Sequence, residues 1–313
     1  MTSGRSHARM LEPAGNSVRT TLMIRPLRSP MLTDVILTIR ERYHPLYHLR
    51  KLSVFRAVSR LLDFPVAIRV DKISHPICLS SSRNLSWILS QGRIVEADER
   101  ENFLKLTAMA GCKRLYDIGA NVGSYGFMFA CVDPARSVVM FEPDPLNASL
   151  LRTTLRRFAV NNCELTEAAV CDRDDLLTFH SDLVSGATGS IRRDKSFIET
   201  HNHGKNIPLV VRSVSLDQFT SSGAQDPDVI KIDAEGAEIS ILRGAEGLFA
   251  RTNPVLFFEC DTDKAEIRTY LAERNYLLFD ATTLEPADEP AHNTVALHKT
   301  RHSSTIESLT VAH

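Results

Sequence analysis

The stretch "RLYDIGANVGSYGFMFA" at residues 114–130 decides the fold. A short apolar run ends at Asp117, a turn that contains Gly119 and Gly123 follows, and a second apolar run with helical periodicity comes directly after it. A buried strand that leads into a helix through a glycine-containing turn is typical of a cofactor-binding βα unit. The question is which cofactor such a turn binds.

The glycine spacing argues against a phosphate-binding loop. A dinucleotide turn needs the pattern G-x-G-x-x-G, whereas Gly119, Gly123 and Gly126 are spaced G-x-x-x-G-x-x-G, with Asn121 at the position of the second glycine. A P-loop also needs a Gly-Lys-Ser/Thr sequence, which this stretch lacks. The pattern D-x-G-x-N-x-G therefore favours a cofactor that ends in an amino acid.

Two acids fit the two ends of such a cofactor. Gly119 and Gly123 permit a tight turn, and the start of the following helix can receive a carboxylate. Asp117 can accept a hydrogen bond from an ammonium group, and Glu142, at the end of the next apolar run, is placed to accept the hydroxyls of a ribose. An amino acid at one end and a ribose at the other describe S-adenosylmethionine, which is the cofactor we predict.

Strand-like and helix-like segments alternate through the rest of the chain. The strand-like runs are "RLYDI", "SVVMFE", "CELTEAAV", "DVIKID" and "PVLFFEC", followed by "YLLFD" and "TVALH", which are typical of a terminal antiparallel pair. Repeated β-α units predict an α/β fold with a doubly wound, mostly parallel sheet. Four runs end in an acid, at Asp117, Glu142, Asp233 and Glu259, and the carboxyl ends of parallel strands form the rim where ligands bind.

Several motifs occur in order and give the chain a family resemblance. They are "DIGANVG", "FEPDP", "AAV" at 168–170, "SLDQF", "IKIDAEGAEISILRGA" and "PVLFFE". Over residues 65–280 the chain resembles the FkbM-type family of S-adenosylmethionine-dependent methyltransferases. The resemblance implies a Rossmann-like sheet of seven strands and transfer of a methyl group to a hydroxyl of a glycan, glycolipid or secondary metabolite. It also implies cofactor contacts from Ala120, Asn121, Pro143, Ala168 and Asp233.

Catalysis needs a group that takes the proton of the acceptor hydroxyl. Our candidates are Asp233 first, as a base or as an acid that orients the substrate, then Glu259 and Glu235, with His180, His201 and His203 as further titratable groups. Helix capping is the competing role for Asp233 and Glu235. Asp233, Glu259 and Asp261 could alternatively hold Mg²⁺, but we assign no metal site from the sequence.

The chain divides into four predicted segments. Residues 1–30 are expected to be a flexible basic leader, residues 31–98 an extension with a helix and short strands, residues 99–300 the methyltransferase domain, and residues 301–313 a tail. The domain carries a polar insertion at residues 172–215, which we expect to act as a substrate lid. This segment is called the insertion below.

Charge is distributed unevenly along the chain. Residues 1–60 contain eleven Lys/Arg and three Asp/Glu, an excess of +8, so the remaining 253 residues carry −9. Residues 46–62 predict a basic amphipathic helix that docks on the body or lies on a membrane surface. Without a transmembrane-length run or a signal-peptide core, we expect a cytoplasmic protein, with possible peripheral membrane contact through this helix.

Two other functions compete with the glycan or small-molecule methyltransferase. The basic arm could anchor RNA for a nucleic-acid methyltransferase, although the acidic body and the single Trp argue against a nucleic-acid partner. The chain could also be a non-catalytic module that binds S-adenosylmethionine. The retained acids at every rim position argue against that reading. The sequence does not indicate an oligomeric state.

Overall fold

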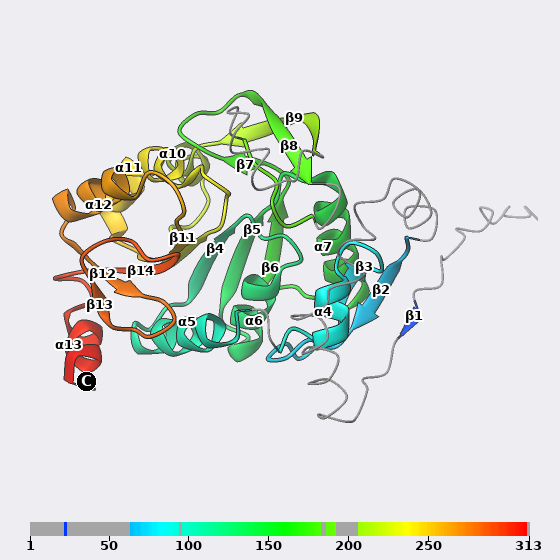
Figure 1. The fold of residues 1–313 in the computed structure, drawn as a ribbon, viewed down its shortest axis with the longest axis horizontal. Coiled ribbons are helices and arrows are strands. Elements are labelled where there is room, and N and C mark those ends of the chain that lie inside the picture. The colour runs from blue at the N-terminus through cyan, green and yellow to red at the C-terminus, as the bar shows by residue number, and fades with distance from the viewer. Residues whose placement is uncertain (1–21, 24–62, 94–95, 183–185, 192–205, 312–313) are drawn as a thin grey trace, which may run out of the picture.

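The computed structural model describes residues 22–23, 63–93, 96–182, 186–191 and 206–311 (Figure 1). Its centre is a sheet of eight strands in the order β13-β12-β14-β11-β10-β4-β5-β6. These strands are β4 (Arg114–Ile118), β5 (Ser137–Phe141), β6 (Cys163–Thr166), β10 (Val229–Ile232), β11 (Val255–Glu259), β12 (Tyr276–Asp280), β13 (Pro286–Ala287) and β14 (Asn293–His298). The predicted doubly wound α/β fold is confirmed, and β13 adds a short strand to the seven that we expected.

The five central strands are parallel and buried. β4 lies between β5 and β10, and β11 and β6 continue the parallel order on the two sides. All four residues of β10 are buried, as are the last four of β4 and the first four of β11. Helices cover both faces of such a sheet, so its strands consist of continuous apolar runs. The antiparallel pair predicted at the end of the domain is β12 with β14, and β14 also pairs with β11.

Alternate residues of the strands enter two separate hydrophobic cores. Leu115 and Phe257 belong to one core, whereas Tyr116 and Phe258 belong to the other. The first core receives side chains from α5 (Ala97–Met109), α6 (Ser124–Val132), α7 (Pro145–Arg157) and α13 (Ser303–Val311). The second receives them from α9 (Leu216–Ser221), α10 (Glu238–Arg243), α11 (Glu246–Thr252) and α12 (Lys264–Glu273). The period of two along each strand thus places helices on both sides of the sheet.

Two segments are divided where the sequence pattern is continuous. "CELTEAAV" forms β6 and then β7 (Ala169–Val170), which leaves the central sheet and pairs with β9 (Asn206–Val214). The helical run after Asp233 forms α10 and α11, which meet at Gly244. A Cβ atom at Gly244 would lie 2.2 Å from the carbonyl oxygen of Cys171, so this close backbone contact requires glycine.

The insertion forms a hairpin that stands apart from the central sheet. β8 (Leu176–Asp182) pairs antiparallel with β9, and the two strands lie above the ends of β4 and β5 in Figure 1. Residues 183–185 and 192–205 of the insertion lie outside the described residues. The described part places Phe179 and residues 186–191 over the rim of the sheet.

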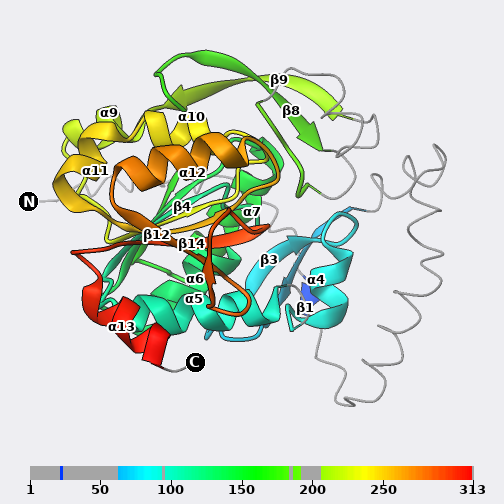
Figure 2. The same cartoon turned by 60° about the vertical axis from the view of Figure 1, so that its left-hand side comes forward.

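The described part of the N-terminal extension packs against α7. β2 (Pro65–Ile68) and β3 (Ile77–Ser80) are short strands that form an antiparallel pair, β1 (Leu22–Met23) pairs with β2, and α4 (Leu85–Ser90) follows (Figure 2). The backbone N–H of Cys78 donates to Oγ1 of Thr154 on α7 at 2.9 Å. The basic helix predicted at residues 46–62 lies outside the described residues.

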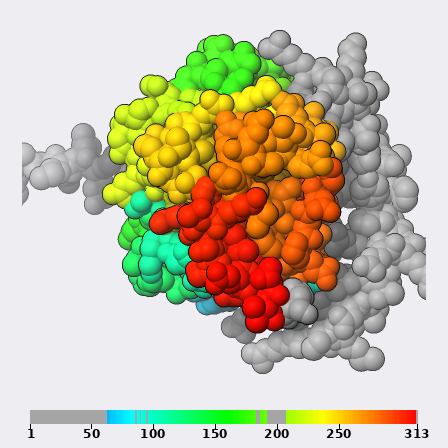
Figure 3. All heavy atoms as spheres, turned by 90° about the vertical axis from the view of Figure 1, so that its left-hand side faces the viewer, coloured from blue at the N-terminus to red at the C-terminus, as the bar shows by residue number. Residues whose placement is uncertain are grey.

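The segment that we predicted as a tail contains a docked helix. Ser303–Val311 form α13, drawn in red beside the orange segments in Figure 3. Leu309 is 2% exposed within the first core, whereas Val311 on the same helix is 86% exposed. The boundaries of the four segments remain predictions.

Leu309→Ala should destabilise the fold much more than Val311→Ala. Truncating a buried leucine removes its transfer free energy and leaves a cavity, so we expect a loss of about 2–4 kcal/mol in the free energy of unfolding. Val311→Ala is expected to cost less than about 0.5 kcal/mol. Urea unfolding of both variants measures the difference, and equal losses would mean that α13 is not packed on the core.

Candidate cofactor and active site

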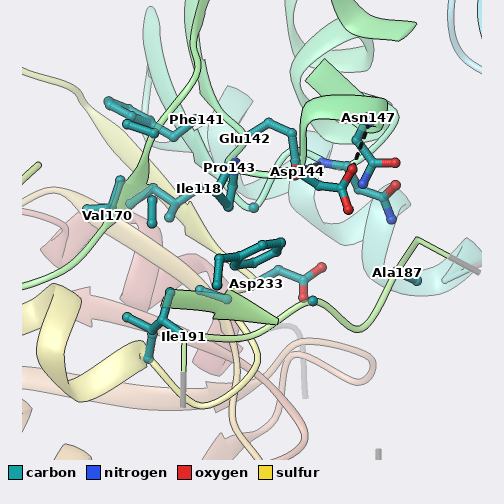
Figure 4. A pocket seen from close by; sticks show the side chains of 18 of the residues that line it. Ile118, Phe141, Glu142, Pro143, Asp144, Asn147, Val170, Ala187, Ile191 and Asp233 are labelled. Atoms are coloured by element: carbon teal, nitrogen blue, oxygen red, sulfur yellow. Dashed lines mark hydrogen bonds between the residues drawn. The ribbon is translucent and has the colours of Figure 1, made fainter. Parts of the chain in front are cut away.

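A pocket opens at the carboxyl ends of the parallel strands, as we predicted from the positions of the acids. It encloses about 550 Å³ of space free of protein atoms, part of it open to solvent. Its lining combines the ends of β4, β5 and β10 with β7 and the insertion (Figure 4). Of the predicted site residues, the lining includes Gly119, Asn121, Glu142, Pro143, Ala168 and Asp233.

The turn after β4 is held tightly between its two neighbouring strands. The backbone N–H groups of Gly119 and Ala120 both donate to the carbonyl of Phe141 at 3.0 Å. Gly119 has φ +73°, and a Cβ atom there would lie 1.8 Å from the carbonyl oxygen of Asp233. Gly123, with φ +81°, is the N-cap residue of α6. Gly119 therefore permits close contact between the turns after β4 and β10, so that both can border one pocket.

Asp117 lies behind the pocket and does not line it. Its side chain is buried, and Oδ2 accepts a hydrogen bond from the N–H of Gly126 in the first turn of α6 at 2.9 Å. Burial raises the pKa of Asp117 to about 6, against the lowering effect of the Lys231 charge. Within the described residues Oδ1 has no hydrogen-bond partner, so an acceptor remains for a donor such as an ammonium group.

Glu142 is oriented by two backbone donors. Oε1 accepts from the N–H of Asp144 at 2.8 Å, and Oε2 accepts from the N–H of Asn121 at 2.7 Å. The side chain is 4% exposed, and burial raises the pKa of its carboxyl to about 8. Asn121 also lines the pocket, and its Oδ1 atom has no hydrogen-bond partner in the described part of the chain. These acceptors fit the hydroxyl and ammonium donors of S-adenosylmethionine.

The walls between the polar ends of the pocket are apolar. Ile118, Phe141, Pro143 and Val170 come from the sheet and its connections, and Ile191 comes from the insertion (Figure 4). Phe179 of β8 also contributes, and a Cβ atom at Gly189 would lie 2.3 Å from its ring. Such walls suit the flat apolar faces of an adenine ring.

Asp233 points into the pocket and forms an ion pair beneath it. Its Oδ2 atom lies 2.6 Å from Nζ of Lys231, a residue of β10 whose side chain is 7% exposed. Burial lowers the pKa of Lys231, but the negative charges of Asp233 and Asp117 outweigh it and raise the pKa above its ordinary value. Lys231 thus stays protonated. The N-cap of α10 is Ala237, so neither Asp233 nor Glu235 caps that helix.

Glu235 and Glu259 lie beside the pocket and do not line it. Burial and the charges of Asp233 and Glu259 raise the pKa of Glu235 to about 9. Burial and the charge of Asp233 raise the pKa of Glu259 to about 7, although His292 opposes this. The carbonyl of Glu235 accepts from Oγ of Ser190 at 2.7 Å, which connects the insertion to the turn after β10.

His292 is a site residue that the sequence analysis missed. Its Nδ1 lies 2.7 Å from Oδ1 of Asp261, and its Nε2 lies 3.5 Å from Oε1 of Glu259. Burial lowers the pKa of His292, but the hydrogen bond to Asp261 and the charges of both acids outweigh burial and raise it. No motif marks His292, because the antiparallel pairing of β14 with β11 brings it to the rim.

The structure groups the metal-ligand candidates differently from the sequence. The ligand atoms of Glu259, Asp261 and His292 lie within 4.8 Å of one another, whereas Asp233 is paired with Lys231.

Among the histidines of the insertion, His180 lies in β8, where its backbone pairs with Ser190, and His201 and His203 lie outside the described residues.

The fold and the site together define a Rossmann-like α/β domain for a nucleoside-containing ligand. A sequence profile described as the methyltransferase FkbM domain matches residues 117–278, more than half of the chain. The chain belongs to this methyltransferase family, and the resemblance seen in the sequence is confirmed. Family membership assigns S-adenosylmethionine as the methyl donor.

The sequences of individual relatives match parts of this chain. The 2-O-methyltransferase NoeI of Sinorhizobium fredii is 29% identical over 146 residues, 44% of this chain and 59% of NoeI, so the match spans less than two thirds of that relative. The hexuronic acid methyltransferase AglP of Haloferax volcanii is 23% identical over 235 residues, 71% of this chain and 90% of AglP. A solved FkbM methyltransferase from Methylobacillus flagellatus has a TM-score of 0.43 at 16% identity and covers 68% of this chain and 52% of that one.

Among the described residues, no helix is both long enough and apolar enough to cross a membrane.

Glu235→Gln should reduce the pH dependence of stability. The pKa of Glu235 rises from 4.5 to about 9 on folding, so between these pH values the folded state binds more protons than the unfolded state. The folded state gains stability by holding this proton on Glu235. That gain is fully present below about pH 4.5 and is lost as the pH rises towards 9. At pH 8 the variant, which mimics the neutral form, should therefore be more stable than the wild type by about 1 kcal/mol or more.

Thermal unfolding of Glu235→Gln at pH 6 and pH 8 measures this effect. Glu273→Gln on α12 is the matched control, because Glu273 is exposed. If Glu235→Gln and its control respond to pH in the same way, burial and the charges of Asp233 and Glu259 do not hold Glu235 in its neutral form.

Proposed function

We propose that the protein is an S-adenosylmethionine-dependent O-methyltransferase that acts on a hydroxyl of a carbohydrate-type acceptor. The observation that carries the proposal is the placement of Glu142 and Asp233 around one pocket, with the glycine turn between their strands. The two named relatives support the acceptor class, because one is a 2-O-methyltransferase and the other a hexuronic acid methyltransferase. Glycolipids and secondary metabolites also carry hydroxyl groups, so they belong to the same class of hydroxyl acceptors as the carbohydrate that we propose.

The cofactor residues would act at different parts of the ligand. The turn with Gly119, Ala120, Asn121 and Gly123 would receive the amino-acid end, where the N-terminus of α6 favours a carboxylate. Glu142 would accept the ribose hydroxyls. Pro143 and Ala168 would border the adenine, and Asp117, behind the pocket, would hold the first turn of α6 in place.

When bound, the cofactor supplies an activated methyl group on a sulfonium. Its transfer to the acceptor oxygen would break the carbon–sulfur bond and leave the electron pair on a neutral thioether. The chain must align the hydroxyl with the carbon–sulfur axis, which is a positioning task. Asp233, which is held by Lys231 and points into the pocket, would orient the hydroxyl.

The proton of the hydroxyl needs an acceptor, and Glu259 suits this role. Its pKa of about 7 lies where a general base works best near neutral pH. His292 lies beside it and is in turn held by Asp261, so a proton taken by Glu259 can pass to the imidazole and reach solvent. Glu235, whose pKa is raised to about 9, would remain protonated and act as a hydrogen-bond donor at the same rim.

The setting of this activity is also a proposal. We propose that the enzyme is cytoplasmic. If its acceptor is a glycolipid, residues 46–62 contact the membrane surface that carries this acceptor. An RNA acceptor and a non-catalytic role are the alternatives, and the experiments below distinguish them. If the wild type does not bind S-adenosylmethionine in calorimetry at high micromolar concentration, it is neither a carbohydrate methyltransferase nor an RNA methyltransferase.

Glu142→Gln should weaken cofactor binding by about tenfold or more. The substitution keeps the shape of the side chain, but glutamine cannot ionise. At pH 9, above the Glu142 pKa of about 8, it therefore replaces charge-assisted hydrogen bonds to ribose with neutral ones and changes one acceptor to a donor. Isothermal titration with S-adenosylmethionine gives the affinity. Glu164→Gln on β6, where the side chain is exposed, is the control and should bind as the wild type does.

Asp233→Asn should lower turnover by about a hundredfold while changing the cofactor affinity by less than about threefold. The carboxylate is expected to contact the acceptor hydroxyl, whereas most contacts to the cofactor come from the turn after β4 and from Glu142. Methyl transfer to oligosaccharides that contain uronic acid, compared with a polyketide hydroxyl and with RNA, measures turnover and the acceptor class together. Unchanged turnover in this variant would contradict the role of Asp233.

A further inference from the structure

Arg83 is a buried cation outside the part of the chain that matches the family. It follows β3, and its side chain is 7% exposed. The turn that carries it is fixed locally, because the N–H of Arg83 donates to Oγ of Ser80 at 2.9 Å and the N–H of Ser80 donates to Oδ1 of Asn84 at 2.8 Å. The guanidinium therefore extends from a defined backbone position.

The guanidinium joins the start of α7 to the insertion. Its Nη2 donates to the carbonyl of Asp182, the last residue of β8, at 2.9 Å and lies 3.4 Å from Oδ2 of Asp144. It also packs against Gly186, where a Cβ atom would lie 2.4 Å from Nη2. The side chain of Asp144 is 3% exposed, so this ion pair is buried on both sides. Three segments that are distant in the sequence thus meet at one side chain.

Asp144 links this ion pair to the carboxylate of Glu142. The N–H of Asp144 donates to Oε1 of Glu142, and Oδ1 of Asp144 caps α7 by accepting from the N–H of Leu146 at 2.8 Å. Asn147, one residue further, donates through Nδ2 to the carbonyl of Gly186 at 2.8 Å. Asp144, Asn147, Gly186 and Glu142 all line the pocket, whereas Arg83 itself does not (Figure 4).

We propose that Arg83 is a positioning residue of the cofactor site, which holds Asp144 and the Gly186 loop so that Glu142 faces the ribose and the insertion closes one wall of the pocket. The inference rests on the proposed function, because it takes the ligand to be S-adenosylmethionine. It makes the N-terminal extension part of the cofactor site. Asp144, Asn147 and Gly186 line the pocket, so Arg83 acts on the ligand only through them.

The charge of Arg83 also acts on Glu142. Burial raises the pKa of Glu142, the charge of Asp144 raises it further, and the charge of Arg83 lowers it. Among the described residues, Asp144 and Arg83 are the charged side chains with the largest effects on the pKa of Glu142, and the carboxyl also accepts from the backbone N–H groups of Asn121 and Asp144. Removing the positive charge should leave a smaller ionised fraction of Glu142 near pH 8 to accept the ribose hydroxyls.

The test measures binding of S-adenosylhomocysteine, which carries the same ribose and tolerates alkaline pH, by isothermal titration between pH 7 and pH 10. Arg83→Met should weaken binding by about tenfold at pH 7.5. The ratio of its dissociation constant to that of the wild type should fall as the pH rises, because Glu142 becomes ionised in both proteins. Arg83→Lys, which keeps the charge, should follow the pH dependence of the wild type.

Two further variants separate positioning from general damage. Arg152→Met on the outer side of α7 removes an exposed ion pair with Glu167 and should bind as the wild type does. Arg83→Met combined with Asp144→Asn leaves no unpaired buried charge, and asparagine retains the helix cap. This double variant should fold like the wild type in thermal unfolding and should bind more weakly than the wild type by a factor that does not fall with pH.

The outcomes distinguish this inference from the proposed function. If the wild type does not bind S-adenosylhomocysteine, the cofactor assignment is wrong and the role of Arg83 is wrong with it. If the wild type binds and Arg83→Met binds equally well, only the inference about Arg83 is overturned. A loss of affinity that is the same at every pH in Arg83→Met and in Arg83→Lys would also overturn it, since that result indicates general structural damage.

Discussion

The contact between the turn after β4 and the turn after β10 is the constraint on which the site depends. Gly119 brings its backbone against the carbonyl of Asp233, and the same turn donates two hydrogen bonds to the carbonyl of Phe141. Any larger residue at Gly119 would separate these strand ends. Because the turn is anchored on both sides, Glu142 on one neighbouring strand and Asp233 on the other can border a single pocket.

The acids of the rim have different roles because their environments differ. Asp117 faces the first turn of α6, Glu142 faces two backbone donors, and Asp233 faces the ammonium group of Lys231. Glu235 and Glu259 lie near other carboxylates, and their pKa values are raised by burial and by repulsion. One edge of a parallel sheet thus carries carboxyl groups whose protonation is set by different combinations of burial, backbone donors and neighbouring charges.

The pocket is completed by segments outside the β-α units. The insertion contributes Phe179 and Ile191 to the apolar wall, and its loop at Gly186 is held by Asn147 of α7. Arg83 from the N-terminal extension connects that loop to Asp144. The β-α units, the insertion and the N-terminal extension therefore form one arrangement around the pocket, while Glu259 and His292 lie beside it at the ends of β11 and β14.

The sequence by itself determined the features that depend on neighbouring residues. The period of the apolar runs, the glycine turn and the acids at the ends of the strands predicted the α/β fold, the methyl donor and a rim that carries Gly119, Glu142 and Asp233. The tertiary structure decided which of these side chains share partners. It paired Asp233 with Lys231, separated Asp117 from the pocket, and brought His292 to Glu259 and Arg83 to Asp144. The physical reason is that strand periodicity and turns are local, whereas these contacts join residues distant in sequence through strand order and helix packing, which no short pattern records.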